Sequence, residues 1–334
     1  MTKIAINGFG RIGRTFYRVA HELGLEIVAV NDLTDAPTLA HLFKYDSSYG
    51  KFEGMIEAGE RFIKVDGQEV KVLNQKDPEK LPWRELGVEV VVESTGIFTD
   101  YSSASNHLEA GAKFVVITAP AKGDKPIKTL VMGVNENEFN PIYDKVVSMA
   151  SCTTNALVPV VDVLNNAFGI EKSTMTTIHS YTMDQRLQDD AHKDLRRARA
   201  AGISMIPTTT GATEAACLVI PDLKNKMDGV SIRVPTATVS LIDFVALLKK
   251  KVTKEEINQA FVDAVGKYQG ALAVTDEPLV SIDFKANPAA SIVDLLSTQV
   301  VDGDLVKVLS WYDNELGYSI RLAEFIKYLS AQIV

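Results

Sequence analysis

The chain has 334 residues, of which 46% are hydrophobic and 23% are charged. This composition is close to the average of globular proteins, so it excludes a chain that is disordered throughout, and the length favours two domains. The formal net charge of −8 argues against nucleic acid or an anionic membrane as the primary partner, because binding to either requires a basic surface.

The cysteine content and the first residues indicate the compartment. Two cysteines are too few for a disulfide framework. The sequence from Met1 to Gly8 lacks the apolar core and the cleavage site of a signal peptide, and no stretch approaches about 18 uninterrupted apolar residues. We therefore expect a cytoplasmic protein without a membrane span.

Strand-like and helix-like stretches alternate along the first half of the chain. The hydrophobic pattern predicts short buried strands at 4–6, 26–30, 89–93 and 114–117. It predicts helices over 11–23, around 39–43 and over 101–111. Such alternation predicts an α/β domain over residues 1–150, with right-handed crossovers and a mostly parallel, doubly wound sheet. Residues 52–72 instead predict an antiparallel insertion.

The second half has a different pattern, which places a domain boundary near residue 150. A helix is predicted over 152–168, and a polar, charged segment covers 182–211. Long strands are predicted at 174–179, 231–234, 239–248, 279–283 and 306–311. Long strands separated by helices predict an α+β domain with a large mixed or antiparallel sheet over 151–315. The chain ends in a predicted amphipathic helix over 316–334.

A glycine motif lies between the first predicted strand and the first predicted helix. Gly8-Phe9-Gly10-Arg11-Ile12-Gly13 fits G-x-G-x-x-G, in which the glycines allow a tight turn, close approach of a pyrophosphate and close helix packing. Asp32 lies 19 residues after Gly13 and follows the next strand. A carboxylate there accepts hydrogen bonds from a ribose hydroxyl and repels a 2′-phosphate. The motif predicts a Rossmann-type domain that prefers NAD to NADP; an ordinary glycine turn is the alternative.

A cysteine and a histidine in the second half are candidates for covalent catalysis. Cys152 opens the predicted helix 152–168, and a helix N-terminus stabilises a thiolate, so we expect a thiol pKa below the usual ~8.5. A neutral imidazole at His179 could take the proton of a nearby thiol. An inert buried cysteine with a structural histidine is the alternative, and no metal-ligand spacing is present. We interpret Cys217 as core, and the other histidines as surface or packing residues: His21, His41, His107 and His192.

Hydroxyl groups and arginines in the second half suit a phosphorylated substrate. The turn Thr208-Thr209-Thr210-Gly211 offers hydroxyl and backbone donors to an oxyanion, and three arginines lie at 196, 197 and 199. Arg233 lies in an apolar strand and needs a carboxylate or a bound phosphate as its partner. Structural ion pairs are the alternative for each arginine.

Five segments resemble the phosphorylating glyceraldehyde-3-phosphate dehydrogenases: Asn7–Arg14, Ala150–Asn155, His192–Arg199, Thr208–Gly211 and Trp311–Tyr318. The resemblance covers essentially the whole chain. It implies oxidation of D-glyceraldehyde 3-phosphate to 1,3-bisphosphoglycerate with NAD and inorganic phosphate, in glycolysis or gluconeogenesis, by a cytoplasmic homotetramer. It also implies that the helix 316–334 packs back on the NAD-binding domain.

The resemblance implies a role for individual residues. Cys152 would form a thioester and His179 would act as the base. The implied cofactor contacts are Gly8, Gly10, Arg11, Ile12, Gly13, Asp32, Lys76, Thr95, Thr118 and Asn314. The implied contacts to the attacking phosphate are Ser151, Thr153, Thr210 and Gly211, and those to the substrate's own phosphate are Thr182 and Arg233. Arg197 also matches an anion-site residue of the family.

Some positions depart from the commonest pattern of the family. Asp190-Ala191 replaces a Leu-Pro pair that is typical of NAD-specific members, so NADP tolerance stays open. One alternative is an erythrose-4-phosphate dehydrogenase, against which the Thr208–Gly211 turn argues. Another is a non-catalytic member that binds NAD or RNA, against which Cys152, His179 and Asn314 argue.

Overall fold

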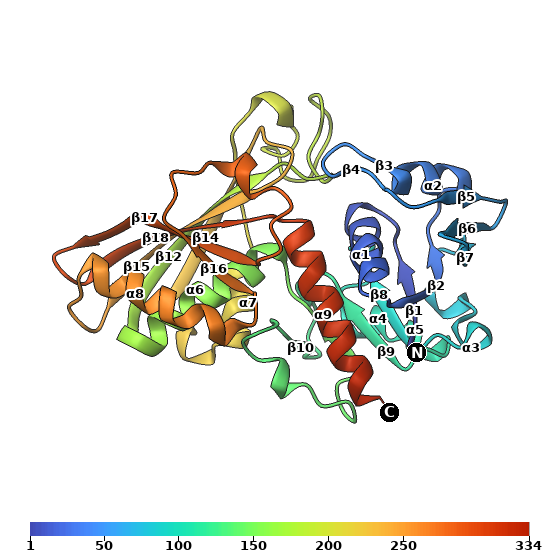
Figure 1. The fold of residues 1–334 in the computed structure, drawn as a ribbon, viewed down its shortest axis with the longest axis horizontal. Coiled ribbons are helices and arrows are strands. Elements are labelled where there is room, and N and C mark those ends of the chain that lie inside the picture. Colours follow the sequence, from blue (N-terminus) through green and yellow to red (C-terminus); the bar gives the residue numbers. More distant parts are fainter. Residues whose placement is uncertain (334) are drawn as a thin grey trace. The chain divides into compact units, whose positions relative to one another are not determined.

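The structure is a computed structural model that describes residues 1–333 (Figure 1). The chain forms two compact units. The first contains Met1–Leu130, Asn137–Ala150 and the described residues from Ser319 on, and the second contains Val131–Glu136 and Ser151–Tyr318. No helix within residues 1–333 combines the length and the apolar character that crossing a bilayer requires.

The first unit is built on a nine-stranded sheet in the order β10-β11-β9-β8-β1-β2-β7-β6-β5. Neighbouring strands are parallel from β10 to β7, and the last two pairings are antiparallel. The strands are β1 Lys3–Asn7, β2 Glu26–Asn31, β5 Ile56–Ala58, β6 Phe62–Val65, β7 Gln68–Leu73, β8 Val90–Glu93, β9 Phe114–Ile117, β10 Lys128–Thr129 and β11 Val146–Ser148. The central strands are runs of Val and Ile buried on both faces, as parallel strands covered by helices are.

Helices connect these parallel strands. They are α1 Arg11–Glu22, α2 Ala36–Lys44, α3 Trp83–Leu86, α4 Tyr101–Ala104 and α5 Asn106–Glu109. The unit also contains, from Ser319 on, the last helix of the chain, α9 Leu316–Gln332, which connects no strands. On α9, the ring of Phe325 packs edge-on against Phe139, with ring centroids 5.5 Å apart. The helix ends at Gln332 rather than at 334, and Val334 lies outside the described residues.

Two predictions for this unit need correction. The helix predicted over 101–111 is two short helices, because Ser103 and Ser105 donate their hydroxyls to nearby backbone carbonyls and compete with a regular helix. The segment 52–72 does form antiparallel hairpins, but β7 also pairs in parallel with β2, so the insertion extends the main sheet. A separate two-stranded sheet joins β3 Tyr45–Asp46 to β4 Gly50–Lys51.

The second unit is built on a seven-stranded mixed sheet in the order β13-β14-β12-β15-β18-β17-β16. Only β12/β14 and β16/β17 pair in parallel. The strands are β12 Ile170–Ser180, β13 Ile206–Thr208, β14 Met227–Val234, β15 Ser240–Leu248, β16 Leu272–Thr275, β17 Ser291–Val301 and β18 Leu305–Tyr312. Buried and half-buried residues alternate along β15, so one face of the sheet carries the core.

Three helices pack against this sheet: α6 Cys152–Phe168, α7 Ala212–Val219 and α8 Lys254–Ala264 (Figure 1). The strand predicted at 279–283 is wrong. Residues Ser281–Phe284 form a 3-10 helix instead, because the Asp283 carboxylate accepts the backbone N–H of Val280 and caps a short turn. The expected fold class, an α/β nucleotide-binding part and a part with a large mixed sheet, is confirmed.

Candidate functional site

The glycine motif forms the loop between β1 and α1. Gly8 has a φ of 92°, and a Cβ there would lie 2.7 Å from the backbone nitrogen of Thr95. A Cβ on Gly13 would lie 2.3 Å from the carbonyl oxygen of Gly8. A Cβ on Gly10 would meet no described atom within 4 Å. Gly8 and Gly13 therefore pack tightly against neighbouring backbone atoms. Gly10, at the N-terminus of α1, leaves space for a ligand to approach the backbone. This is the geometry that a dinucleotide pyrophosphate requires.

Asp32 lies beside this loop. Its Oδ2 accepts the backbone N–H of Phe9 at 2.9 Å, and its Oδ1 accepts that of Thr34 at 3.0 Å. These bonds orient the carboxylate, and each oxygen keeps a lone pair for a ribose hydroxyl. These acceptor oxygens therefore fit the ribose hydroxyls at the adenosine end of NAD.

The other predicted cofactor residues of the first unit differ in their surroundings. Arg11 pairs with Asp46 at 2.7 Å, and Ile12 is half-buried in the first turn of α1. Lys76 is exposed beyond β7. The hydroxyls of Thr95 and Thr118 donate to side-chain and backbone oxygens of Glu93. The structure thus gathers the glycine loop, Asp32, Thr95 and Thr118 at the carboxyl ends of adjacent parallel strands, where open α/β sheets bind ligands.

Cys152 is the first residue of α6. Ser151 caps this helix, since its hydroxyl accepts the backbone N–H of Thr154 at 3.0 Å, and the helix continues past Pro159. The Sγ atom of Cys152 lies 3.5 Å from Nε2 of His179, which is the last residue but one of the long strand β12. The fold therefore brings together the predicted nucleophile and the predicted base within the second unit.

The tautomer of His179 follows from its other ring nitrogen. Nδ1 lies 2.7 Å from the carbonyl oxygen of Ser180, so a proton on Nδ1 satisfies that carbonyl and leaves Nε2 to accept from the thiol. The Arg233 guanidinium also lies close: its Nη1 donates to the same carbonyl at 3.2 Å and lies 2.9 Å from Nδ1, and its positive charge disfavours a second proton on the ring. The geometry is that of a neutral general base.

The protonation states of this pair differ from the expected ones. Burial raises the pKa of the Cys152 thiol, although the charge of Arg233 and hydrogen bonds with Thr153 act in the opposite direction. Burial, together with the charge of Arg233, lowers the pKa of His179 to about 3. The pair therefore rests as a neutral thiol beside a neutral imidazole. This direction is opposite to the lowering of the thiol pKa that was expected at the helix N-terminus, and its largest cause is the loss of hydration.

Two predicted phosphate contacts meet at one acidic residue that the sequence analysis missed, Asp184. The hydroxyl of Thr182 donates to the carboxylate of Asp184, and the guanidinium of Arg197 pairs with the same carboxylate. Arg197 also donates to Thr208 at 2.9 Å. Asp184 could have been suspected from its position two residues after Thr182 in a segment rich in arginine.

The remaining predicted phosphate contacts lie on other elements of the second unit. Arg233 is on β14, and its Nε is buried without a hydrogen-bond partner among the described residues. Thr210 and Gly211 precede α7, and the Thr210 hydroxyl accepts the backbone N–H of Ala212 at 3.2 Å. The Thr153 hydroxyl contacts the hydroxyl of Tyr312 at 2.9 Å, so an internal partner holds it.

Asn314 is held by two serine hydroxyls. Its Oδ1 accepts from Ser180 at 2.9 Å and from Ser240 at 3.1 Å. These bonds fix the orientation of the amide plane. Neither serine was among the predicted site residues.

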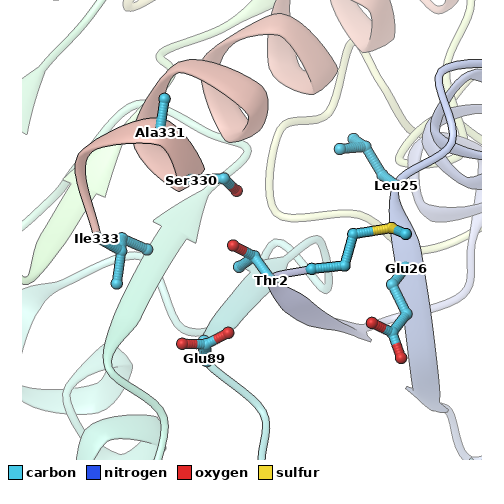
Figure 2. Close-up of a pocket in the computed structure, with 8 residues that line it drawn as sticks. Thr2, Leu25, Glu26, Glu89, Ser330, Ala331 and Ile333 are labelled. Carbon is cyan, nitrogen blue, oxygen red and sulfur yellow. The ribbon is translucent and has the colours of Figure 1, made fainter.

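A pocket of about 430 Å³ lies elsewhere in the first unit, beside the start of β1 and the end of α9 (Figure 2). Its lining includes the carboxylates of Glu26 and Glu89 and the hydroxyls of Thr2 and Ser330. None of the predicted site residues lines it.

Family models match both parts of the chain. Residues 2–101 match the family model described as "Glyceraldehyde 3-phosphate dehydrogenase, NAD binding domain", and residues 151–314 match the C-terminal domain of the same family. The expectation of NAD as cofactor is thereby confirmed.

Curated relatives match over nearly the whole chain. "Glyceraldehyde-3-phosphate dehydrogenase 1" of Bacillus cereus is 54% identical over 334 residues, covering 99% of both chains. "Glyceraldehyde-3-phosphate dehydrogenase" of Geobacillus stearothermophilus is 53% identical, covering 99% of this chain and 98% of the relative. "Glyceraldehyde-3-phosphate dehydrogenase A, chloroplastic" of Zea mays is 51% identical, covering 96% of this chain and 81% of the relative.

Proposed function

Because this chain belongs to the glyceraldehyde 3-phosphate dehydrogenase family, we propose that it oxidises D-glyceraldehyde 3-phosphate to 1,3-bisphosphoglycerate, in glycolysis or gluconeogenesis. It is an NAD-dependent oxidoreductase, and inorganic phosphate is its second substrate in this proposal. The observation that carries the proposal is the 3.5 Å approach of Cys152 Sγ to His179 Nε2. A thiol beside a neutral imidazole is suited to covalent catalysis on an aldehyde.

Cys152 is the nucleophile of the proposed reaction. As Sγ attacks the aldehyde carbon, its proton passes to Nε2 of His179 and then to the substrate oxygen, which gives a hemithioacetal. His179 removes that proton again as hydride leaves the same carbon, and a thioester on Cys152 results. NAD, when bound, supplies the hydride acceptor. Attack by a phosphate oxygen on the thioester releases the acyl phosphate, and Cys152 regains its proton.

Two groups of side chains are the proposed anion sites. Ser151, Thr153, Arg197, Thr210 and Gly211 would contact the attacking phosphate. Thr182 and Arg233 would contact the phosphate of the substrate. Thr182 and Arg197, one donor from each group, both contact the Asp184 carboxylate, so the two proposed anion sites adjoin at that residue.

The proposed domain organisation follows the two units. Residues 1–150 with α9 would form the NAD-binding domain and residues 151–315 the catalytic domain, and the bounds of the two compact units support this division. The proposed cofactor contacts are the glycine loop with Arg11 and Ile12, and Asp32, Lys76, Thr95, Thr118 and Asn314. The backbone N–H groups of Phe9 and Thr34 orient the Asp32 carboxylate. Because its charge repels a 2′-phosphate, we expect NAD to be preferred over NADP.

Assembly as a cytoplasmic homotetramer is also a proposal. Large apolar side chains project from one segment of the second unit, where Met183, Leu187, Leu195 and Ile203 are each at least 80% exposed. Apolar surface of this extent indicates contact with another chain. The absence of a disulfide at either cysteine suits a reducing compartment.

A matrix of substrates and cofactors tests the proposal. NADH formation should be rapid with glyceraldehyde 3-phosphate, should require phosphate for continued turnover, and should be faster with NAD than with NADP. Turnover of erythrose 4-phosphate but not of the triose would instead identify an erythrose-4-phosphate dehydrogenase. NAD binding without turnover of either aldehyde would identify a non-catalytic member.

A further inference from the structure

A buried carboxylate lies beneath the glycine loop. Glu93 ends the apolar strand β8, between the ends of β1 and β9, and its side chain is fully buried. No lysine or arginine of the described residues pairs with it. A buried charge is costly unless hydrogen bonds compensate, so its partners reveal what holds it there.

Four donors surround the two oxygens of Glu93. Oε2 accepts from Asn7 Nδ2 at 2.5 Å and lies 3.1 Å from Nε2 of His107. Oε1 accepts the backbone N–H of Thr95 at 2.9 Å and also the Thr95 hydroxyl. Because every one of these groups can donate, Glu93 is held as a carboxylate.

The protonation of His107 follows from its second partner. The indole Nε1 of Trp83 lies 2.9 Å from Nδ1 of His107, and an indole N–H can only donate. Nδ1 is therefore the acceptor, and the ring proton is on Nε2, where it points to Glu93. His107 is a neutral bridge from Trp83 to the carboxylate, although the sequence alone left it as a surface or packing residue.

The carboxylate fixes a turn that forms one wall of the glycine loop. Ser94 donates its hydroxyl to the carbonyl of Gly8 at 2.6 Å, and the Thr95 nitrogen that Glu93 binds is the atom a Cβ on Gly8 would strike. A displacement of this turn would therefore displace Gly8. The hydroxyl hydrogen of Thr95 is already donated to Glu93, so Thr95 contributes to the loop through its position.

We propose that Glu93 and His107 are positioning residues for NAD binding, which hold the turn at Ser94 and Thr95 against the glycine loop. The inference rests on the proposed function only in taking NAD as the ligand of that loop. It predicts that the hydrogen bond from His107 to Glu93, rather than the volume of the imidazole, sets the affinity for NAD.

Two substitutions of His107 distinguish an effect of its hydrogen bond to Glu93 from an effect of the imidazole volume. His107→Gln places an amide N–H near the position of Nε2 and keeps the donor to Glu93. His107→Asn places an amide near Nδ1, keeps an acceptor for Trp83, and loses the donor to Glu93. Calorimetric titration of the full chain with NAD should give a Kd about tenfold higher for His107→Asn, because a hydrogen bond to a charged group is lost. For His107→Gln the Kd should stay within about threefold of wild type.

Glu93→Gln provides a second test should His107→Asn fail to fold. The amide has one acceptor oxygen in place of two, so either the His107 side or the Thr95 side loses its bond, and the Kd for NAD should again rise about tenfold. The turnover number at saturating NAD should change less than twofold, because the reacting groups are untouched. Glu89→Gln is the matched control, since this carboxylate binds Lys3 and Lys113 and not the loop.

The outcomes are distinct. Equal Kd values for His107→Asn and His107→Gln, or an unchanged Kd for Glu93→Gln, would overturn the positioning role while leaving the proposed function intact. A wild-type chain that does not bind NAD would overturn both.

Discussion

The Sγ atom of Cys152 lies 3.5 Å from Nε2 of His179, where it can give its proton directly to the imidazole. Cys152 begins α6 and packs against the core of the second unit, and His179 is the buried last residue but one of β12. Burial keeps the two groups neutral at rest. The nucleophile is therefore generated only when the proton moves, which couples activation to attack on the substrate.

Replacing the nucleophile tests its role most directly. Cys152→Ser should lower kcat by about 10⁴-fold or more, because a hydroxyl beside the same base is a much weaker nucleophile and gives no thioester. NADH formation from glyceraldehyde 3-phosphate measures the effect. Cys217→Ser is the control, since this half-buried thiol contacts the carbonyl of Leu223 instead and should leave kcat within about twofold. Full activity of Cys152→Ser would remove Cys152 from the mechanism.

The raised pKa of the Cys152 thiol predicts the pH dependence of alkylation. Burial favours the neutral thiol, so the thiolate accumulates at a higher pH than in a free cysteine. The rate of iodoacetamide modification should therefore still rise above pH ~8.5. Arg233→Gln should move the inflection further upward, since the guanidinium lowers the thiol pKa. An inflection well below pH 8.5 would mean that the resting pair is ionised.

The lowered pKa of His179 predicts a loss of stability in acid. Its folded-state pKa of about 3 lies below the unfolded value of ~6.5, so the unfolded chain binds the proton first as the pH falls. The stabilisation is complete above pH ~6.5 and is lost progressively toward pH 3, by at most about 1.4 kcal/mol per pH unit. Urea midpoints at pH 7 and pH 5 should therefore differ more for wild type than for His179→Asn. The same pH dependence in both proteins would contradict the assignment.

The Asp32 carboxylate predicts cofactor choice. Asp32→Asn keeps the shape of the side chain but removes its charge, so the ratio of kcat/KM for NAD to that for NADP should fall about tenfold or more. Asp35→Asn is the control, because that carboxylate caps α2 through Thr38 and faces no cofactor group in the proposed site. An unchanged ratio for Asp32→Asn would show that another residue selects the cofactor.

Local patterns allowed much of this protein to be predicted from sequence. Apolar runs such as Val90 to Val92 identify buried strands, because the burial of a parallel strand on both faces leaves no polar position. The spacing of Gly8, Gly10 and Gly13 and the position of Cys152 at a helix start are likewise features of short segments. The strand predicted at 279–283 failed because a side-chain cap, rather than the apolar pattern, determines that turn.

Properties that depend on distant partners required the tertiary structure. The sequence by itself determined which residues could act as nucleophile, base and cofactor loop, because these depend on residue type and local spacing. Only the tertiary structure decided that the pKa of the Cys152 thiol is raised and not lowered, because the residues packed around the thiol remove its hydration. It alone also decided that Glu93 and His107, 14 residues apart, meet beneath the glycine loop, because their contact depends on how a strand and a helix pack.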